Sequence, residues 1–92
     1  MAPRREDDGG LAVLGLRRGE RARFRRPGMG RWQGVVVEGR ERDGSLLLRD
    51  AKGAARAIRI EHVEVATTGP RGARTWEPVV ERAARTEQLR LL

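Results

Sequence analysis

The residues best equipped for chemistry in this sequence are seven arginines and one tryptophan between positions 17 and 32. A guanidinium group presents a fork of hydrogen-bond donors that fits a phosphate, and an indole ring can stack on a nucleobase. These residues are Arg17, Arg18, Arg21, Arg23, Arg25, Arg26, Arg31 and Trp32. Because residues 17–31 carry +6 of the chain's net charge of +7, the pattern predicts a surface that contacts nucleic acid.

Two simpler explanations of the arginines stay open. Nineteen of the 20 basic residues are arginine, a preference that a GC-rich genome also produces. The arginines of a half-buried strand would also form a solvated outer face, with Trp32 folded over the core. Since no base-reading pattern accompanies the arginines, we expect contact with DNA or RNA that does not depend on sequence.

The sequence offers no constellation of catalytic residues. His62 and Ser45 are the single histidine and the single serine, and the chain has no cysteine. Gly28 and Gly30 do not begin a dinucleotide-binding motif, because residue 33 is glutamine and a strand is expected to follow. Metal-ligand spacing is also absent. We therefore expect a protein that is not an enzyme and that uses no cofactor, metal or small-molecule substrate.

Short β-strands must position the arginines. Residues 20–26 alternate, so that Ala22 and Phe24 share one face and the intervening arginines share the other, about 7 Å apart. That spacing suits the phosphates of a nucleic-acid strand. Asp43-Gly44 is a strong hairpin signal. The expected strands are residues 20–26, 31–38, 45–49, 55–60 and 61–66, with a bulge near Gly34 and further turns at 27–30 and 50–53.

The remaining segments flank this β region. Residues 1–10 are polar and predict a disordered tail, whereas the apolar run at 11–16 is expected to pack against the domain as a strand or turn. Residues 67–74 are rich in Gly, Pro and Arg and predict a linker. An amphipathic helix is expected over 75–87, capped by Thr75. Its apolar stripe would comprise Trp76, Val79, Val80, Ala83 and Ala84.

The β region resembles the opening of SH3-like barrels of the KOW and Tudor type. The matching residues are Leu16, Gly19, Phe24, Gly34, Val35 and Val37, which stand for a Leu-x-x-Gly turn, an alternating strand and a Gly-Val-Val second strand. The resemblance covers residues 16–66 and departs from KOW at Trp32. It implies a mainly β fold, a five-stranded SH3-like barrel over 11–66, followed by the helix and a short tail. Such barrels bind DNA, RNA or proteins, so the fold alone does not choose among these partners.

The last five residues, QLRLL at 88–92, do not fit the apolar stripe of the helix. On a helical wheel with Val80 at zero, Leu91 falls near +20°, Leu92 near about +120° and Leu89 near about 180°. A straight helix therefore cannot bury all three leucines. Either the helix stops near Thr86, or Leu89 and Leu92 are exposed.

This pentapeptide resembles the motif that binds the bacterial replication sliding clamp, Gln-Leu-x-Leu-Phe and its Leu-ended variants. The resemblance implies that Gln88 fixes the orientation of the peptide by hydrogen bonds, while Leu89, Leu91 and Leu92 fill apolar pockets. Arg90 would point to solvent. The motif departs from the commonest form at Leu92, where phenylalanine is usual. Packing of the leucines at the end of the helix is the competing interpretation.

Together these patterns predict a DNA-associated accessory protein of replication or repair, with a basic barrel on nucleic acid and residues 88–92 on the sliding clamp. Two alternatives are a Tudor-like module that binds RNA polymerase and a KOW-like protein associated with RNA or the ribosome. No segment approaches the roughly 20 apolar residues that span a membrane. We expect a cytoplasmic, nucleoid-associated protein with no membrane partner.

Overall fold

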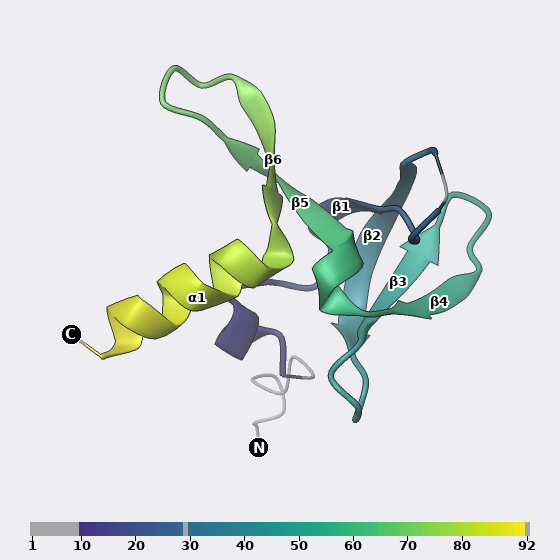
Figure 1. Ribbon diagram of the computed structural model, residues 1–92, viewed down its shortest axis with the longest axis horizontal. Helices are drawn as coiled ribbons and strands as arrows, with labels where there is room; N and C mark the ends of the chain where they lie inside the picture. Colours follow the sequence, from purple (N-terminus) through teal and green to yellow (C-terminus); the bar gives the residue numbers. More distant parts are fainter. Residues whose placement is uncertain (1–9, 29, 92) are drawn as a thin grey trace.

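The structure is a computed structural model that describes residues 10–28 and 30–91. In this part of the chain, six antiparallel strands form one open sheet, and a single α-helix follows them (Figure 1). The elements are η2 (Ala12–Leu14), β1 (Arg21–Phe24), β2 (Gln33–Arg40), β3 (Leu46–Asp50), β4 (Ala55–Ile58), η3 (Ile60–His62), β5 (Val63–Thr68), β6 (Arg74–Pro78) and α1 (Val79–Arg90). The expected mainly β fold with a C-terminal helix is confirmed.

The strands lie in the order β4-β3-β2-β1-β5-β6. β1 is central: Arg23 lies opposite Gly34 of β2 on one side and opposite Glu64 of β5 on the other. Among the described residues no strand pairing joins the edge strands β4 and β6, so the five-stranded closed barrel is not confirmed. The bulge expected near Gly34 lies instead between Val37 and Gly39.

The core lies on one face of the sheet and follows the alternation of the strands. Ala22 and Phe24 of β1 are buried, as their spacing predicts, and the β2 residues Val35 and Val37 join them. Three leucines of the N-terminal apolar run are also buried, around a short 3-10 helix. The other buried apolar residues are Leu46, Leu48, Ile58, Val63, Val65 and Val79. Their burial fixes which face of β1 presents its arginines to solvent.

Two of the expected turns have clear local causes. In the turn between β2 and β3, Gly44 has a φ of 96° and the Asp43 carboxylate accepts a hydrogen bond from the Ser45 amide at 2.9 Å. Between β3 and β4, the Asp50 carboxylate accepts the amides of Lys52 and Ala54, each at 2.9 Å. Both predictions are confirmed. The turn after β1 includes Pro27 and Gly28, and Met29 lies outside the described residues.

The expected linker and the expected start of the helix are wrong. Thr67 and Thr68 end β5, and residues 74–78 return as β6, so the segment is a hairpin with its turn at 69–73 (Figure 1). Trp76 therefore lies on a strand, opposite Ala66, and does not belong to a helical stripe. The helix begins at Val79 after Pro78, so Thr75 is not its cap. Thr and Trp favour strands, and Pro lacks the amide that continues a ladder.

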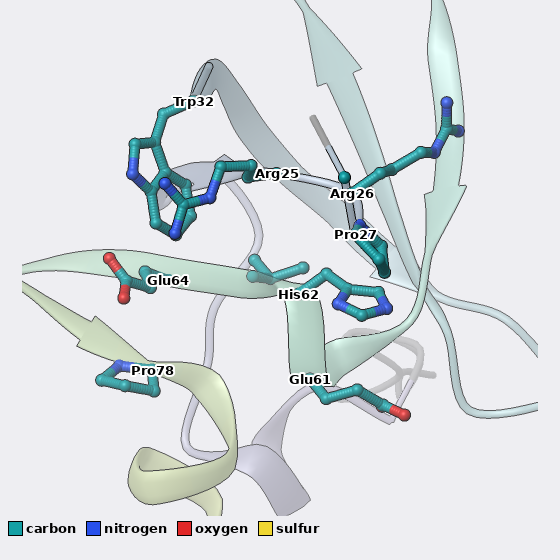
Figure 2. Close-up of a pocket in the computed structure, with 10 residues that line it drawn as sticks. Arg25, Arg26, Pro27, Trp32, Glu61, His62, Glu64 and Pro78 are labelled. Atoms are coloured by element: carbon teal, nitrogen blue, oxygen red, sulfur yellow. The ribbon is translucent and has the colours of Figure 1, made fainter. Parts of the chain in front are cut away.

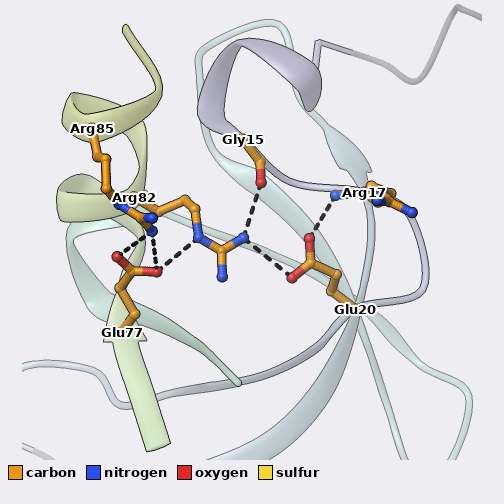
Figure 3. A network of polar contacts seen from close by, with 6 residues as sticks. All are labelled: Gly15, Arg17, Glu20, Glu77, Arg82 and Arg85. Atoms are coloured by element: carbon orange, nitrogen blue, oxygen red, sulfur yellow. Dashed lines mark hydrogen bonds and ion pairs between the residues drawn. The ribbon is translucent and has the colours of Figure 1, made fainter. Parts of the chain in front are cut away.

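A polar network around Arg82 fastens α1 to the domain (Figure 3). The Arg82 guanidinium donates to the Glu77 carboxylate at 2.7 Å, to the Gly15 carbonyl at 2.9 Å and to Glu20 at 3.4 Å. Arg85 donates to both oxygens of Glu77, at 2.9 and 2.7 Å. Gly15 has a φ of 76°, and a Cβ there would collide with the Thr86 hydroxyl, so the helix approaches this backbone closely.

Apolar packing of α1 against the core is confined to the first half of the helix. Val79 is buried and Ala83 contacts the core, whereas Val80 is 44% exposed and Ala84 is exposed, so the expected stripe is only partly buried. The helix then projects away from the sheet toward the end of the chain (Figure 1). In the described residues no helix is long and apolar enough to cross a membrane. The tail expected at 1–10 lies outside the described residues except for Gly10.

Candidate nucleic-acid interface

Arg23 is the centre of a cluster on the sheet face opposite the core. Its guanidinium donates two hydrogen bonds to one Glu64 oxygen, at 2.9 and 2.6 Å. Its central carbon lies 4.1 Å from the ring centroid of Trp32 and 4.5 Å from that of Trp76. A cation within about 6 Å of an aromatic ring is attracted to it. Arg23 thus holds two tryptophans from β6 and from the segment before β2 in fixed positions.

Arg25 extends the cluster beyond the end of β1. Its guanidinium carbon lies 4.3 Å from the Trp32 centroid, and Figure 2 shows the two side chains against each other. Arg26 points away from Arg25 in Figure 2. Its guanidinium carbon lies 5.8 Å from the ring centroid of Phe24. Trp32 is half-buried. Arginines therefore cover Trp32 on the outer face of the sheet. This position matches neither of the two expectations from the sequence, an open stacking surface or a ring folded over the core.

Trp32 separates two open hollows on this face. The first has a volume of about 520 Å³ and lies between the β1–β2 turn and η3, with Arg25, Arg26 and His62 in its wall (Figure 2). The second has a volume of about 440 Å³ and lies over β1 and β2, with Arg21 and Trp76 in its wall. Both volumes fall within the roughly 300–1,000 Å³ of ligand pockets.

The acidic groups near these hollows already have cationic partners. The ion pairs are Arg23–Glu64 at 2.6 Å, Arg49–Glu38 at 3.0 Å, Arg59–Glu61 at 3.2 Å and Arg56–Asp50 at 3.3 Å. The hydrogen bond from Arg49 keeps the pKa of Glu38 below its ordinary value. In the part of the chain that the structure describes, no carboxylate pairs with Arg21, Arg25, Arg26 or Arg31. The face therefore carries an uncompensated positive charge, which attracts polyanions.

The structure brings five of the eight predicted residues to one region and leaves three outside it. Arg17 and Arg18 line a separate hollow beside Arg82, and the Arg18 guanidinium donates to the Glu38 carbonyl at 2.9 Å. Neither touches Trp32. The third, Arg31, is exposed and lines neither hollow. The five residues in the region are Arg21, Arg23, Arg25, Arg26 and Trp32.

Sequence reasoning missed three members of this face. Trp76 was assigned to a helix, Glu64 was not singled out as the partner of Arg23, and Arg74 lines a small hollow with Arg21. One signal was available for Trp76 and Arg74. The β-branched and aromatic residues on both sides of Gly-Pro-Arg-Gly at 69–72 are typical of a hairpin. Glu64 is 41 positions from Arg23, and no local pattern reveals that pair.

The proposed docking residues lie at the other end of the molecule. Gln88, Leu89 and Arg90 form the last turn of α1, and Leu91 caps it. Gln88 is exposed, and the side chains of Leu89 and Leu91 are 64% and 79% exposed. Leu91 was expected on the buried stripe, but the helix has already left the domain at this point. Leu92 lies outside the described residues.

The chemistry available on this face is the binding of anions and of planar rings. Among residues 10–28 and 30–91, no cluster of three or more His, Cys, Asp or Glu side chains could hold a metal ion. Comparison of the chain with protein-family models, with curated proteins and with solved structures found no match. The function must therefore be argued from the arginines, the tryptophans and the hollows themselves.

Proposed function

We propose that this protein binds nucleic acid without sequence preference, through the arginines around Trp32. The observation that carries the proposal is the set of arginines without acidic partners, Arg21, Arg25 and Arg26, beside two hollows that share one tryptophan. Phosphate contacts of this kind supply most of the affinity of non-specific complexes. DNA is the partner we favour, with a role as an accessory protein of replication or repair; RNA would use the same chemistry.

The pre-built cluster supports this proposal further. Arg23 is held by Glu64 and by two rings, so the tryptophans need little ordering when a ligand arrives. Neither hollow has a side-chain amide in its walls, so the face lacks the bidentate group that reads adenine. Affinity would come from phosphates and stacking, which all sequences share.

The test is fluorescence anisotropy of labelled DNA of several unrelated sequences, titrated with the full chain over a range of salt concentrations. We expect dissociation constants in the micromolar range that agree within about threefold among sequences and weaken steeply with salt. An RNA arm of the same sequence distinguishes the two nucleic acids. Undetectable or salt-independent binding would overturn the proposal.

We also propose that the first five strands are an open form of the SH3-like arrangement. Support comes from β1, which pairs with both β2 and β5, so that the five strands enclose one apolar core. The β6 strand extends this arrangement beyond the barrel. The alternative of a Tudor-like module on RNA polymerase would use the same strands, and a pull-down that survives nuclease treatment would favour it.

A second candidate function concerns the end of α1. We propose that Gln88–Leu92 docks on the replication sliding clamp, because Leu89 and Leu91 expose most of their apolar surface and Gln88 is free of the domain. In a helix, residues two apart lie about 200° apart around the axis. Leu89 and Leu91 therefore cannot enter one groove until the last turn of α1 unwinds.

The clamp proposal predicts that L89A/L91A abolishes capture of the sliding clamp by the tagged protein. V80A is the matched control, because Val80 is an exposed apolar residue of the same helix. Thermal denaturation should show little change in either variant, since all three side chains are exposed. Equal loss of capture in V80A, or full capture by L89A/L91A, would contradict this proposal without touching the nucleic-acid one.

A further inference from the structure

We infer that the hollow above Gly34 receives an unpaired nucleobase, so that the ligand of this face is single-stranded nucleic acid. This inference rests on the proposed nucleic-acid function and makes it more specific. It depends on three observations: an absent side chain at Gly34, two tryptophans in the lining of the hollow, and cations at the rim.

Gly34 keeps the hollow open. It lies in β2 directly opposite Arg23, on the outer face of the sheet. A Cβ added there would meet no heavy atom within 4 Å, and its φ does not lie in the left-handed range. The backbone therefore does not require glycine at this position, although a β-branched residue would be favourable in a strand. What glycine provides is space, about 440 Å³ in the hollow as a whole.

The surroundings of that space suit a planar ring. Trp32 and Trp76 both line the hollow, and the Arg23 guanidinium lies within 4.5 Å of each ring centroid. Val36, which is 38% exposed, adds an apolar surface next to Gly34. Arg23 lies over the Trp76 ring, but Trp76 is still 38% exposed. A nucleobase can therefore stack on the indole surface that is left open and place its thin edge over the glycine.

Cations along β1 would hold the phosphates on either side of the base. Arg21 lines the same hollow and pairs with no carboxylate of the described residues. Arg25 lies four positions further along the chain, just past the end of β1, in the wall of the first hollow on the other side of Trp32. Four residues of extended chain span about 13 Å, so the two arginines can contact different phosphates of one strand.

A duplex does not offer this fit. Bases in a double helix are paired and stacked, so their faces cannot reach Trp32 or Trp76 unless the base is flipped out at a cost in free energy. Duplex DNA would contact only the arginines. The hollow thus predicts that the protein binds a single strand more tightly than a duplex of the same nucleic acid. The positive charge alone does not predict this preference.

The test compares G34V with A57V in the full chain. Ala57 is an exposed strand residue of β4 outside the hollow, so A57V adds a β-branched side chain to the same sheet without filling the space. The probes are fluorescein-labelled oligothymidine, oligouridine and a DNA duplex of equal length, followed by anisotropy. Thermal denaturation confirms that each variant is folded, and G34A replaces G34V if the larger side chain prevents folding.

We expect the wild type and A57V to bind oligothymidine at least about tenfold tighter than duplex. G34V should lose most of that preference while its duplex affinity stays within about twofold. Tighter binding of oligouridine than of oligothymidine would identify RNA as the nucleic acid that supplies the base. Equal affinity of the wild type for single strand and duplex, or an unchanged preference in G34V, would overturn the inference and leave the proposed function standing. Failure of the wild type to bind any of the probes would overturn both.

Discussion

Two clusters of arginine in this protein look alike in sequence and differ in what surrounds them. Beside α1, Arg82 and Arg85 share the carboxylates of Glu77 and Glu20, so their charges are compensated within the domain (Figure 3). On the sheet face, Arg23 has Glu64, but Arg21 and Arg25 have no carboxylate partner in the described chain. The first cluster joins elements of the fold, and the second offers charge to a partner.

The comparison shows why arginine content alone is a poor guide to function. Arg82 has a side chain only 14% exposed and bonds to residues 62 and 67 positions away, which is the behaviour of a structural residue. Arg25 lies against the ring of Trp32, which leaves its charge unneutralised. An arginine whose guanidinium donates to a carboxylate therefore has a structural role, whereas an arginine without such a partner can offer its charge to a ligand.

The largest expected effect comes from removing the centre of the compensated cluster. R82A removes one donor each from the Gly15 carbonyl, from Glu20 and from Glu77. Because the two carboxylates keep other donors and are partly hydrated, the fold should lose about 2–3 kcal/mol, less than for a fully buried pair. The melting temperature should fall by roughly 10–20 °C. Calorimetry or chemical denaturation measures this.

Below its melting temperature, R82A should bind nucleic acid as the wild type does. A loss of affinity in the folded variant would show that the two clusters are not separate. An unchanged melting temperature would show that the Arg82 network does not hold α1 in place.

A smaller effect on stability, together with an effect on binding, is expected from R23Q. Glu64 would lose two hydrogen bonds and the tryptophans would lose the cation between them, at a cost of about 1–2 kcal/mol. Affinity for nucleic acid should fall less than in R21Q, because the charge of Arg23 is already compensated by Glu64. Denaturation and anisotropy on both variants test this order, and a larger loss of affinity in R23Q would place Arg23 in direct contact with the ligand.

The smallest expected effect is a dependence of stability on acid pH. Burial would raise the pKa of Glu77, but the hydrogen bonds from Arg82 and Arg85 outweigh it and lower the pKa below the ordinary 4.5. A carboxylate with a lowered pKa stabilises the fold above its unfolded-state value, and the contribution is lost as pH falls through the folded-state value. The free energy of unfolding should therefore decline below about pH 4.5, and the decline should be shallower in R82A. An equal decline of the unfolding free energy with pH in the wild type and R82A would contradict the conclusion that Arg82 lowers the pKa of Glu77.

The sequence predicted what depends on neighbouring residues. The alternation in β1 indicated which side of the strand carries arginine, and Asp43-Gly44 and Asp50 to Gly53 predicted turns that the structure has. Each of these features is set within a few residues, by the two-residue period of a strand or by a side chain that bonds its own backbone.

The rest depends on partners that are distant in the chain. Gly-Pro-Arg-Gly at 69–72 has the composition of a linker as well as of a turn, and only the pairing of Thr67 with Thr75 decides between them. Trp76 is wrongly predicted on a helix because the residues before it are interpreted as a linker. The contacts of Arg23 with Trp76 and of Arg82 with Gly15 have no local signal at all.

The salt dependence of binding in two charge-matched double variants tests the central claim most directly. R21Q/R25Q removes two arginines from the sheet face, and R42Q/R90Q removes two exposed arginines from the β2–β3 turn and the end of α1. The slope of log K against log salt for oligothymidine should fall in magnitude by about 1.4 in R21Q/R25Q, for two lost phosphate contacts, and stay unchanged in R42Q/R90Q. Equal slopes in the two variants would contradict the claim that the uncompensated arginines around Trp32 hold the nucleic acid.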